Sequence, residues 1–138
     1  MSIHDVPMPR ILNEEWSCHS ERQIANDIWE ILDHAQAEAA GVLLAIQEGR
    51  ISGSYYEGEC ACLVGTIANL RGLPNCEDGR AWFTSKRMHM DGIGHDQERP
   101  AERFFMFICK GDTPANSAQS RFAEWAVKTW IEHNTVTA

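Results

Sequence analysis

The chain has 138 residues, 43% hydrophobic and 23% charged, a balance that suits one globular core and excludes wholesale disorder. Twelve Lys and Arg residues against twenty Asp and Glu residues give a net charge of −8, which argues against a conventional nucleic-acid binder. The start shows no secretion signal and no apolar run approaches the roughly 20 residues of a membrane span, so we expect a cytoplasmic protein.

Residues 1–19 hold two of the five prolines and little periodicity, and we expect them to form an extended N-terminal arm. The strongest helical pattern follows. Ser20 and Gln23 match a capping box, and Gly49 is a typical C-terminal stop. Apolar residues recur at helical spacing between them, so the sequence predicts one amphipathic helix over residues 21–48.

The same helical wheel gathers acidic residues on a separate arc of roughly 140°, opposite a core-facing arc of roughly 120°. We interpret the acidic arc as a solvated face with His34 beside it; a metal site built from His34 and these carboxylates is the less typical alternative. The residues of the acidic arc are Asp27, Glu30, Asp33, Glu38 and Glu48.

A second helix is predicted over residues 59–70, ended by Gly72 and Pro74, with Gly65 and Ala68 small enough for close packing against another helix. Residues 73–99 are punctuated by proline and glycine, and we expect a long irregular loop there with at most one short helix or strand.

Pro100 suits the first position of a short helix over residues 100–110, although the composition of 104–109 also fits a buried strand. Thr113 and Pro114 are the expected cap and first turn of a last helix that runs to about residue 132. The chain is therefore expected to be mainly α, with residues 20–133 forming a single-domain bundle of about four helices and residues 134–138 a tail.

Two stretches, residues 51–69 and residues 99–105 followed by 111–114, resemble a family of small uncharacterised proteins from phages, prophages and environmental bacteria. The resemblance covers roughly residues 40–132. Because that family has no established activity, it carries no catalytic role over to this chain. It implies a phage-type accessory protein.

The five cysteines are an odd number, and we interpret them as reduced thiols without a disulfide framework. Cys60 would lie at the start of the helix over 59–70, where the helix dipole favours a thiolate. With His95 as base and Asp96 beside it, this pattern permits a cysteine hydrolase. The plainer interpretation is that Cys60 and Cys62 are small packing residues.

Soft ligands suited to zinc also occur, as Cys60, Cys62, Cys76 and His95, or as Cys18 with His19. Residues two apart on a helix point about 200° apart, and the sequence lacks a Cys-x2–4-Cys pair. We therefore expect neither a metal nor a cofactor.

The favoured hypothesis is a non-enzymatic protein that binds a partner with a basic surface, and no membrane or nucleic acid directly. Its concrete form is a phage-type inhibitor of a bacterial defence complex that mimics nucleic acid. The alternatives are the cysteine hydrolase and a virion structural or assembly component, with the oligomeric state left open. The expected partner-binding residues are Asp27, Glu30, Asp33, His34 and Glu38.

Overall fold

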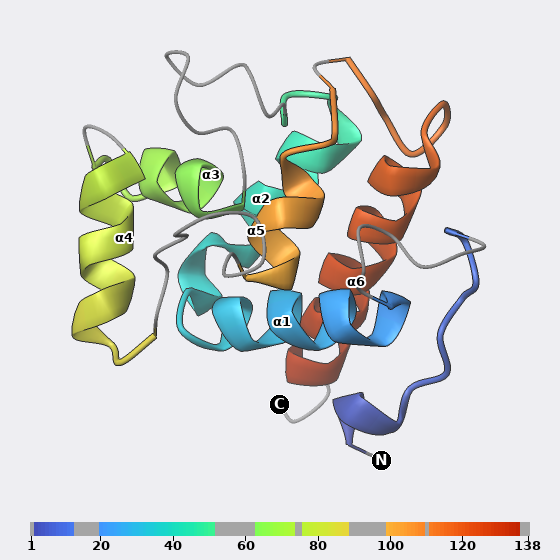
Figure 1. Cartoon of the computed structure of the whole chain (residues 1–138), viewed down its shortest axis with the longest axis horizontal. Helices are drawn as coiled ribbons and strands as arrows, with labels where there is room; N and C mark the ends of the chain where they lie inside the picture. Colours follow the sequence, from blue (N-terminus) through green and yellow to red (C-terminus); the bar gives the residue numbers. More distant parts are fainter. Residues whose placement is uncertain are drawn as a thin grey trace.

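The computed structural model describes residues 2–12, 20–51, 63–73, 76–88, 99–109 and 111–135. Within these ranges the protein is helical, without a strand, which confirms the mainly α prediction (Figure 1). The described residues form six α-helices rather than about four, because one expected helix is divided in two and a further helix lies within the expected loop. The elements are η1 (Ile3–Asp5), α1 (Glu21–Asp33), η2 (Gln36–Glu38), α2 (Ala39–Gln47), α3 (Leu63–Leu70), α4 (Cys76–Ser85), α5 (Pro100–Phe105) and α6 (Ala118–Thr135).

The N-terminus of α1 is fixed by the capping box that the sequence predicts. The Ser20 hydroxyl accepts a hydrogen bond from the Gln23 backbone N–H at 3.2 Å, and the Gln23 side-chain oxygen accepts one from the Ser20 N–H at 2.8 Å. These two bonds satisfy donors that the first turn of a helix otherwise leaves unpaired. The helix therefore begins at the expected place, with Ile24, Ile28 and Leu32 fully buried beneath it.

The prediction of one continuous helix over residues 21–48 is wrong. The α-helix ends at Asp33, and Ala35 has φ −138° and ψ 49°, outside the helical region. After the short η2 turn, α2 begins at Ala39 without a side-chain cap. Both α1 and α2 pack their apolar residues against α6, so the helical spacing of buried residues continues across the bend although the helix does not.

Both α2 and α3 end as predicted, in glycines with positive φ. Gly49 has φ +69° and Gly72 has φ +76°. In each case the next residue closes the motif, with Arg50 N–H bonding the Ala45 carbonyl and Leu73 N–H bonding the Ala68 carbonyl, both at 2.9 Å. These are Schellman ends, which glycine forms without a Cβ penalty.

Helix α4 covers residues 76–85 of the stretch where we expected a long irregular loop with at most one short helix or strand, so the helix is the option that the structure shows there. It packs beside α3, as Figure 1 shows. Gly79 makes this close approach possible, because a Cβ built on Gly79 would lie 2.8 Å from the Ala68 Cβ. Ala68 thus makes the close contact between helices that the sequence indicated. Phe83, on α4, is fully buried.

The stretch after Arg99 is helical, so the strand alternative for residues 104–109 is wrong for its first part. Helix α5 is shorter than expected and gives way to turns at Met106 and Phe107. Helix α6 begins at Ala118 rather than near Thr113. Ser117 supplies the cap, because its hydroxyl accepts a hydrogen bond from the Ser120 N–H at 3.2 Å.

Aromatic side chains fill the core where α1, α5 and α6 meet. The ring centroids of Trp29 and Trp125 are 6.0 Å apart, and those of Phe104 and Phe122 are 5.6 Å apart. The indole N–H of Trp29 donates to the Ala126 carbonyl at 2.9 Å inside this cluster. These contacts fix α1 against α6, so the opposite side of α1 is presented outward in a defined position.

Candidate functional site

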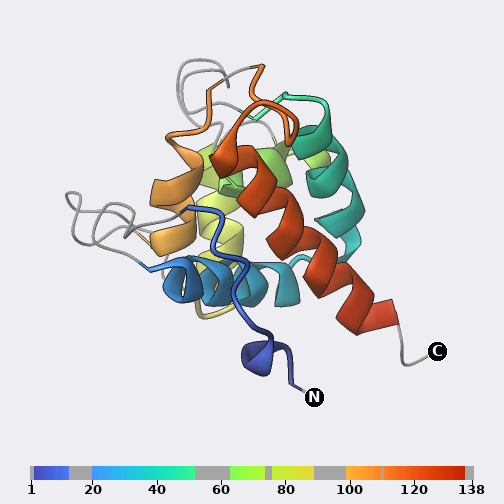
Figure 2. The ribbon, with the colours of Figure 1, turned by 90° about the vertical axis from the view of Figure 1, so that its right-hand side faces the viewer.

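A pocket of about 450 Å³ opens along the outward side of α1, between η1 and the beginning of α5. We call it the α1 groove. Figure 2 shows the N-terminal segment running beside α1 at this side of the molecule. The lining residues are His4, Gln23, Asn26, Asp27, Glu30, Asp33 and Pro100.

The long wall of the groove is a stripe of polar side chains on α1. Its residues lie three or four positions apart, from Gln23 through Asn26 and Glu30 to Asp33, which places them on one helical face. Ten residues of α-helix extend about 15 Å, so the stripe spans nearly three turns. The apolar residues at the intervening positions fill the core on the other side.

Arg99, just before α5, ties this wall to its neighbour. Its guanidinium forms an ion pair with Asp27 Oδ1, and the same Nη2 lies 3.2 Å from Glu30 Oε1. Burial by itself lowers the pKa of Arg99, but the hydrogen bond and charge of Asp27, followed by those of Glu30, outweigh that effect and raise the pKa above its ordinary value. Arg99 is therefore a permanent cation beside the carboxylates of Asp27 and Glu30.

Asp33, at the far end of the stripe, is exposed and accepts a hydrogen bond from the Trp130 indole N–H at 2.8 Å. Glu30 is also exposed, with 54% of its side chain accessible. Glu30 and Asp33 thus present two accessible carboxylates along the groove, whereas Asp27 is buried against Arg99. Negative charge faces solvent over about one turn of α1.

The short wall is the N-terminal segment, which polar contacts hold on α1. The Arg22 guanidinium donates to the backbone carbonyls of His4 at 2.6 Å and Val6 at 2.9 Å. The His4 Nδ1 lies 3.1 Å from Asn26 Oδ1, and its ring contacts Trp29 edge to face with centroids 6.1 Å apart. The arm expected over residues 1–19 is therefore attached to the helix in its described part, and residues 13–19 lie outside the described residues.

The structure brings together three of the five residues predicted to bind a partner. Asp27, Glu30 and Asp33 line the groove, whereas His34 and Glu38 do not. His34 caps the C-terminus of α1, with its Nδ1 3.0 Å from the Glu30 carbonyl oxygen. Glu38 lies on η2 and pairs with Arg71 at 3.2 Å. A single acidic ridge along residues 21–48 therefore does not exist.

Asp27 differs most from expectation. The helical wheel placed it on the solvent face, but only 9% of its side chain is accessible, and Arg99 and the Ala101 N–H occupy both of its carboxylate oxygens. It supports the groove rather than offering a charge to a partner. Sequence reasoning missed Arg99 as its counterion, because nothing local indicates a contact across 72 positions.

The residues proposed for a cysteine hydrolase, Cys60, His95 and Asp96, lie outside the described residues, as does Cys62. Cys76 begins α4, but its side chain is outside the described part as well. Among the residues that the structure does describe, no group of three His, Cys, Asp or Glu side chains is placed to hold a metal ion. The hydrolase and zinc hypotheses accordingly stay predictions from the sequence.

No described helix combines the length and apolar character needed to cross a membrane. No protein-family model, curated protein or solved structure matches this chain.

Proposed function

We propose that this protein acts by binding another protein, and that the α1 groove receives a basic side chain of that partner. The observation that carries the proposal is the pair of solvent-facing carboxylates of Glu30 and Asp33 in one pocket. They lie three residues apart on a helix that the Asp27–Arg99 ion pair holds in place. Carboxylates fixed in this way are the acceptors that an arginine or lysine side chain of a partner would engage.

The small number of accessible carboxylates favours one basic side chain over an extended polycationic surface. Glu38, whose side chain is only 11% accessible, is paired with Arg71, and Asp27 is paired with Arg99. These two carboxylates therefore add no exposed charge to the site. A nucleic-acid mimic needs a long run of accessible anions, which α1 does not provide, so inhibition of a bacterial defence complex stays a hypothesis of the sequence.

The indole groups of two tryptophans allow a direct test by nuclear magnetic resonance. In the full-length protein at low salt, we would titrate a hexa-arginine peptide and follow the indole N–H signals. Trp130 donates to Asp33 in the groove, so its signal is expected to shift. Trp82 lies on α4 under the Arg71 guanidinium and does not line the groove, so its signal is expected to stay. Raising the salt concentration should weaken binding steeply, because the contact is between charges.

Two matched variants separate the groove from general negative charge. Glu30→Gln and Glu48→Gln each remove one charge from a glutamate that is 54% or 51% accessible and paired with an arginine. Only Glu30 lines the groove. We expect Glu30→Gln to weaken peptide binding several-fold and Glu48→Gln to leave it near the wild-type value. Equal effects of the two variants, or an unmoved Trp130 signal, would refute the proposed site.

A further inference from the structure

Helix α2 presents an apolar surface to solvent. Its sequence, Ala39–Gln47, contains a single polar side chain, Gln47, whereas a surface helix normally carries polar residues on its outer face. Val42, Ala45 and Ile46 are buried against the core, yet Ala40 and Leu44 are exposed on the other side. The helix is therefore more hydrophobic than its packing within one chain requires.

A leucine of α3 extends this surface. Leu70 is exposed and lies over Gly41, because a Cβ built on Gly41 would be 2.9 Å from both terminal methyl carbons of Leu70. Leu44 follows Gly41 by about one turn of the same helix, which puts the two leucines on neighbouring parts of one surface. We call this surface the α2 face. It comprises Ala37, Ala40, Gly41, Leu44 and Leu70.

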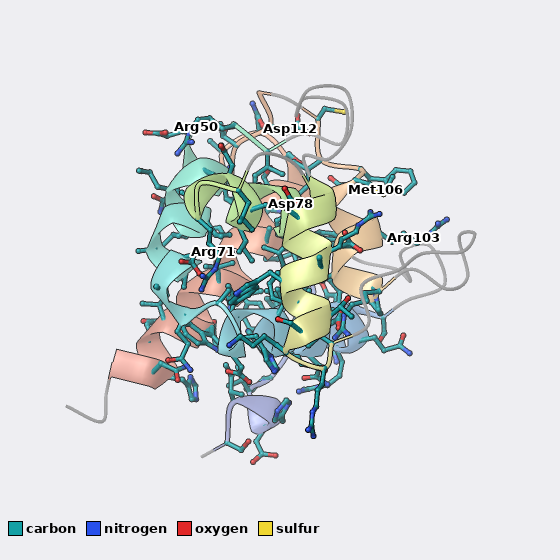
Figure 3. All side chains as sticks on the ribbon, turned by 90° about the vertical axis from the view of Figure 1, so that its left-hand side faces the viewer. Arg50, Arg71, Asp78, Arg103, Met106 and Asp112 are labelled. Atoms are coloured by element: carbon teal, nitrogen blue, oxygen red, sulfur yellow. The ribbon has the colours of Figure 1, made fainter. Side chains whose placement is uncertain are left out.

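Each end of the α2 face carries one ion pair. Glu38 pairs with Arg71 at 3.2 Å where α2 begins, and Glu48 pairs with Arg50 at 2.7 Å where it ends. Figure 3 shows Arg50 and Arg71 at opposite ends of α2. The end at Glu38 therefore holds one charge of each sign, whereas the end at Glu48 also has Glu124, whose Oε2 accepts a hydrogen bond from the Gln47 side chain at 3.1 Å.

We propose that the α2 face is the contact surface between two copies of this chain, with α2 of one copy antiparallel to α2 of the other. A two-fold axis across α2 gives this arrangement, because a symmetric contact uses the same surface on both copies. The Glu38–Arg71 end of each copy then meets the Glu48–Arg50 end of its partner. Glu48, whose side chain is 51% accessible, then lies near the partner's Arg71, and the leucines of the two copies cover one another.

Charge is the reason that the occupant is a second copy. Two chains of net charge −8 repel each other over most approaches. The α2 face itself is apolar. The antiparallel arrangement sets the end that holds Glu48 and Glu124, whose negative charge exceeds that of Arg50 beside them, near the partner's Arg71, so the two ends are complementary. The small exposed residues Ala37 and Ala40 permit a close approach of the helices.

This contact is independent of the proposed function. In Figure 2, α2 lies on the side of the molecule away from α5, which borders the α1 groove. The groove therefore stays open in the dimer, and each dimer presents two grooves. A stable interface usually covers about 800 Å² per partner, which one short helix does not reach. We therefore expect a weak dimer with a dissociation constant in the micromolar range.

Sedimentation equilibrium of the full chain between about 10 µM and 1 mM tests the dimer over the concentrations this affinity implies. The mass is expected to rise from 15.6 kDa towards twice that value. Leu44→Arg brings two guanidinium groups together near the two-fold axis and should weaken association at least about tenfold. Met106→Arg is the matched control, because Met106 is 47% exposed on the α5 side, against 48% for Leu44.

Circular dichroism and thermal unfolding of both variants would show that the fold is intact, since each substituted side chain is already half exposed. A wild-type protein that stays at 15.6 kDa up to 1 mM would overturn the proposal. So would a Leu44→Arg variant that associates as strongly as the wild type. Loss of association in Leu44→Arg alone supports it.

Discussion

The carboxylate of Asp27 caps a helix to which it does not belong. Its Oδ1 binds the guanidinium of Arg99, and its Oδ2 accepts a hydrogen bond from the Ala101 N–H at 3.0 Å. Arg99 is the N-cap residue of α5 but makes no side-chain cap, and Pro100 has no N–H to offer. Asp27 therefore supplies, from α1, the acceptor and the negative charge that the first turn of α5 lacks.

We expect Asp27→Ala to lower the free energy of unfolding by about 3 kcal/mol, because it leaves the Arg99 guanidinium and the Ala101 N–H inside the protein without this partner. Glu30→Ala is the matched control, since Glu30 contacts the same guanidinium but is 54% accessible, and it should cost less than about 1 kcal/mol. Urea denaturation measures both. Similar losses for the two variants would show that burial does not set the strength of these contacts.

The sequence predicted the helices whose ends are chemically marked. The Ser20–Gln23 capping box and the glycine stops at Gly49 and Gly72 depend on hydrogen bonds between residues a few positions apart, so the local sequence predicts them. The bend at Ala35 has no such mark, because neither proline nor glycine is present and the buried spacing continues through it. Both α1 and α2 pack on α6 on either side of the break, and a helical wheel of residues 21–48 does not show this tertiary contact.

The site was predictable only in part, for a related reason. Spacing on α1 brings Glu30 and Asp33 to one face, and the structure keeps them exposed there. The partners of the other carboxylates come from distant positions, Arg99 for Asp27 and Arg71 for Glu38. The sequence gives the number and spacing of the carboxylates, but it does not show which of them form ion pairs within the folded chain.

The close contact of α3 and α4 makes the effect of Gly79→Ala depend on Ala68. Alanine at 79 improves helix propensity by about 1 kcal/mol, but its Cβ would lie 2.8 Å from the Ala68 Cβ, and such overpacking costs about 1–3 kcal/mol. We expect Gly79→Ala to destabilise the wild type and to stabilise the Ala68→Gly variant. A double-mutant cycle by urea denaturation measures the coupling. Effects of equal size and sign in the two backgrounds would contradict the proposed clash.

The start of α6 distinguishes a true cap from an apparent one. Ser117→Ala removes the acceptor of the Ser120 N–H and should cost about 1 kcal/mol of stability. Thr113→Ala is the control, because the helix does not begin there and the Thr113 backbone N–H bonds Asn116 instead. It should change the free energy of unfolding by less than about 0.5 kcal/mol. A larger loss at Thr113 than at Ser117 would place the cap where the sequence first suggested it.

Alanine substitutions at the two glycines that end α2 and α3 distinguish the cost of backbone strain from the cost of a steric clash. Gly49 and Gly72 share a positive φ and the same end motif, so alanine at either position costs about 1 kcal/mol through its backbone alone. A Cβ at Gly72 meets nothing within 4 Å, whereas one at Gly49 would lie 3.1 Å from the carbonyl carbon of Gly111.

The Gly111 N–H also bonds the Gly49 carbonyl at 2.9 Å, so this backbone cannot withdraw without losing a hydrogen bond. We therefore expect Gly49→Ala to lower the free energy of unfolding by at least about 1 kcal/mol more than Gly72→Ala, measured by urea denaturation at equal protein concentration. Equal losses of stability would mean that the backbone at Gly111 moves aside without cost, and that α2 is not anchored to the segment leading into α6.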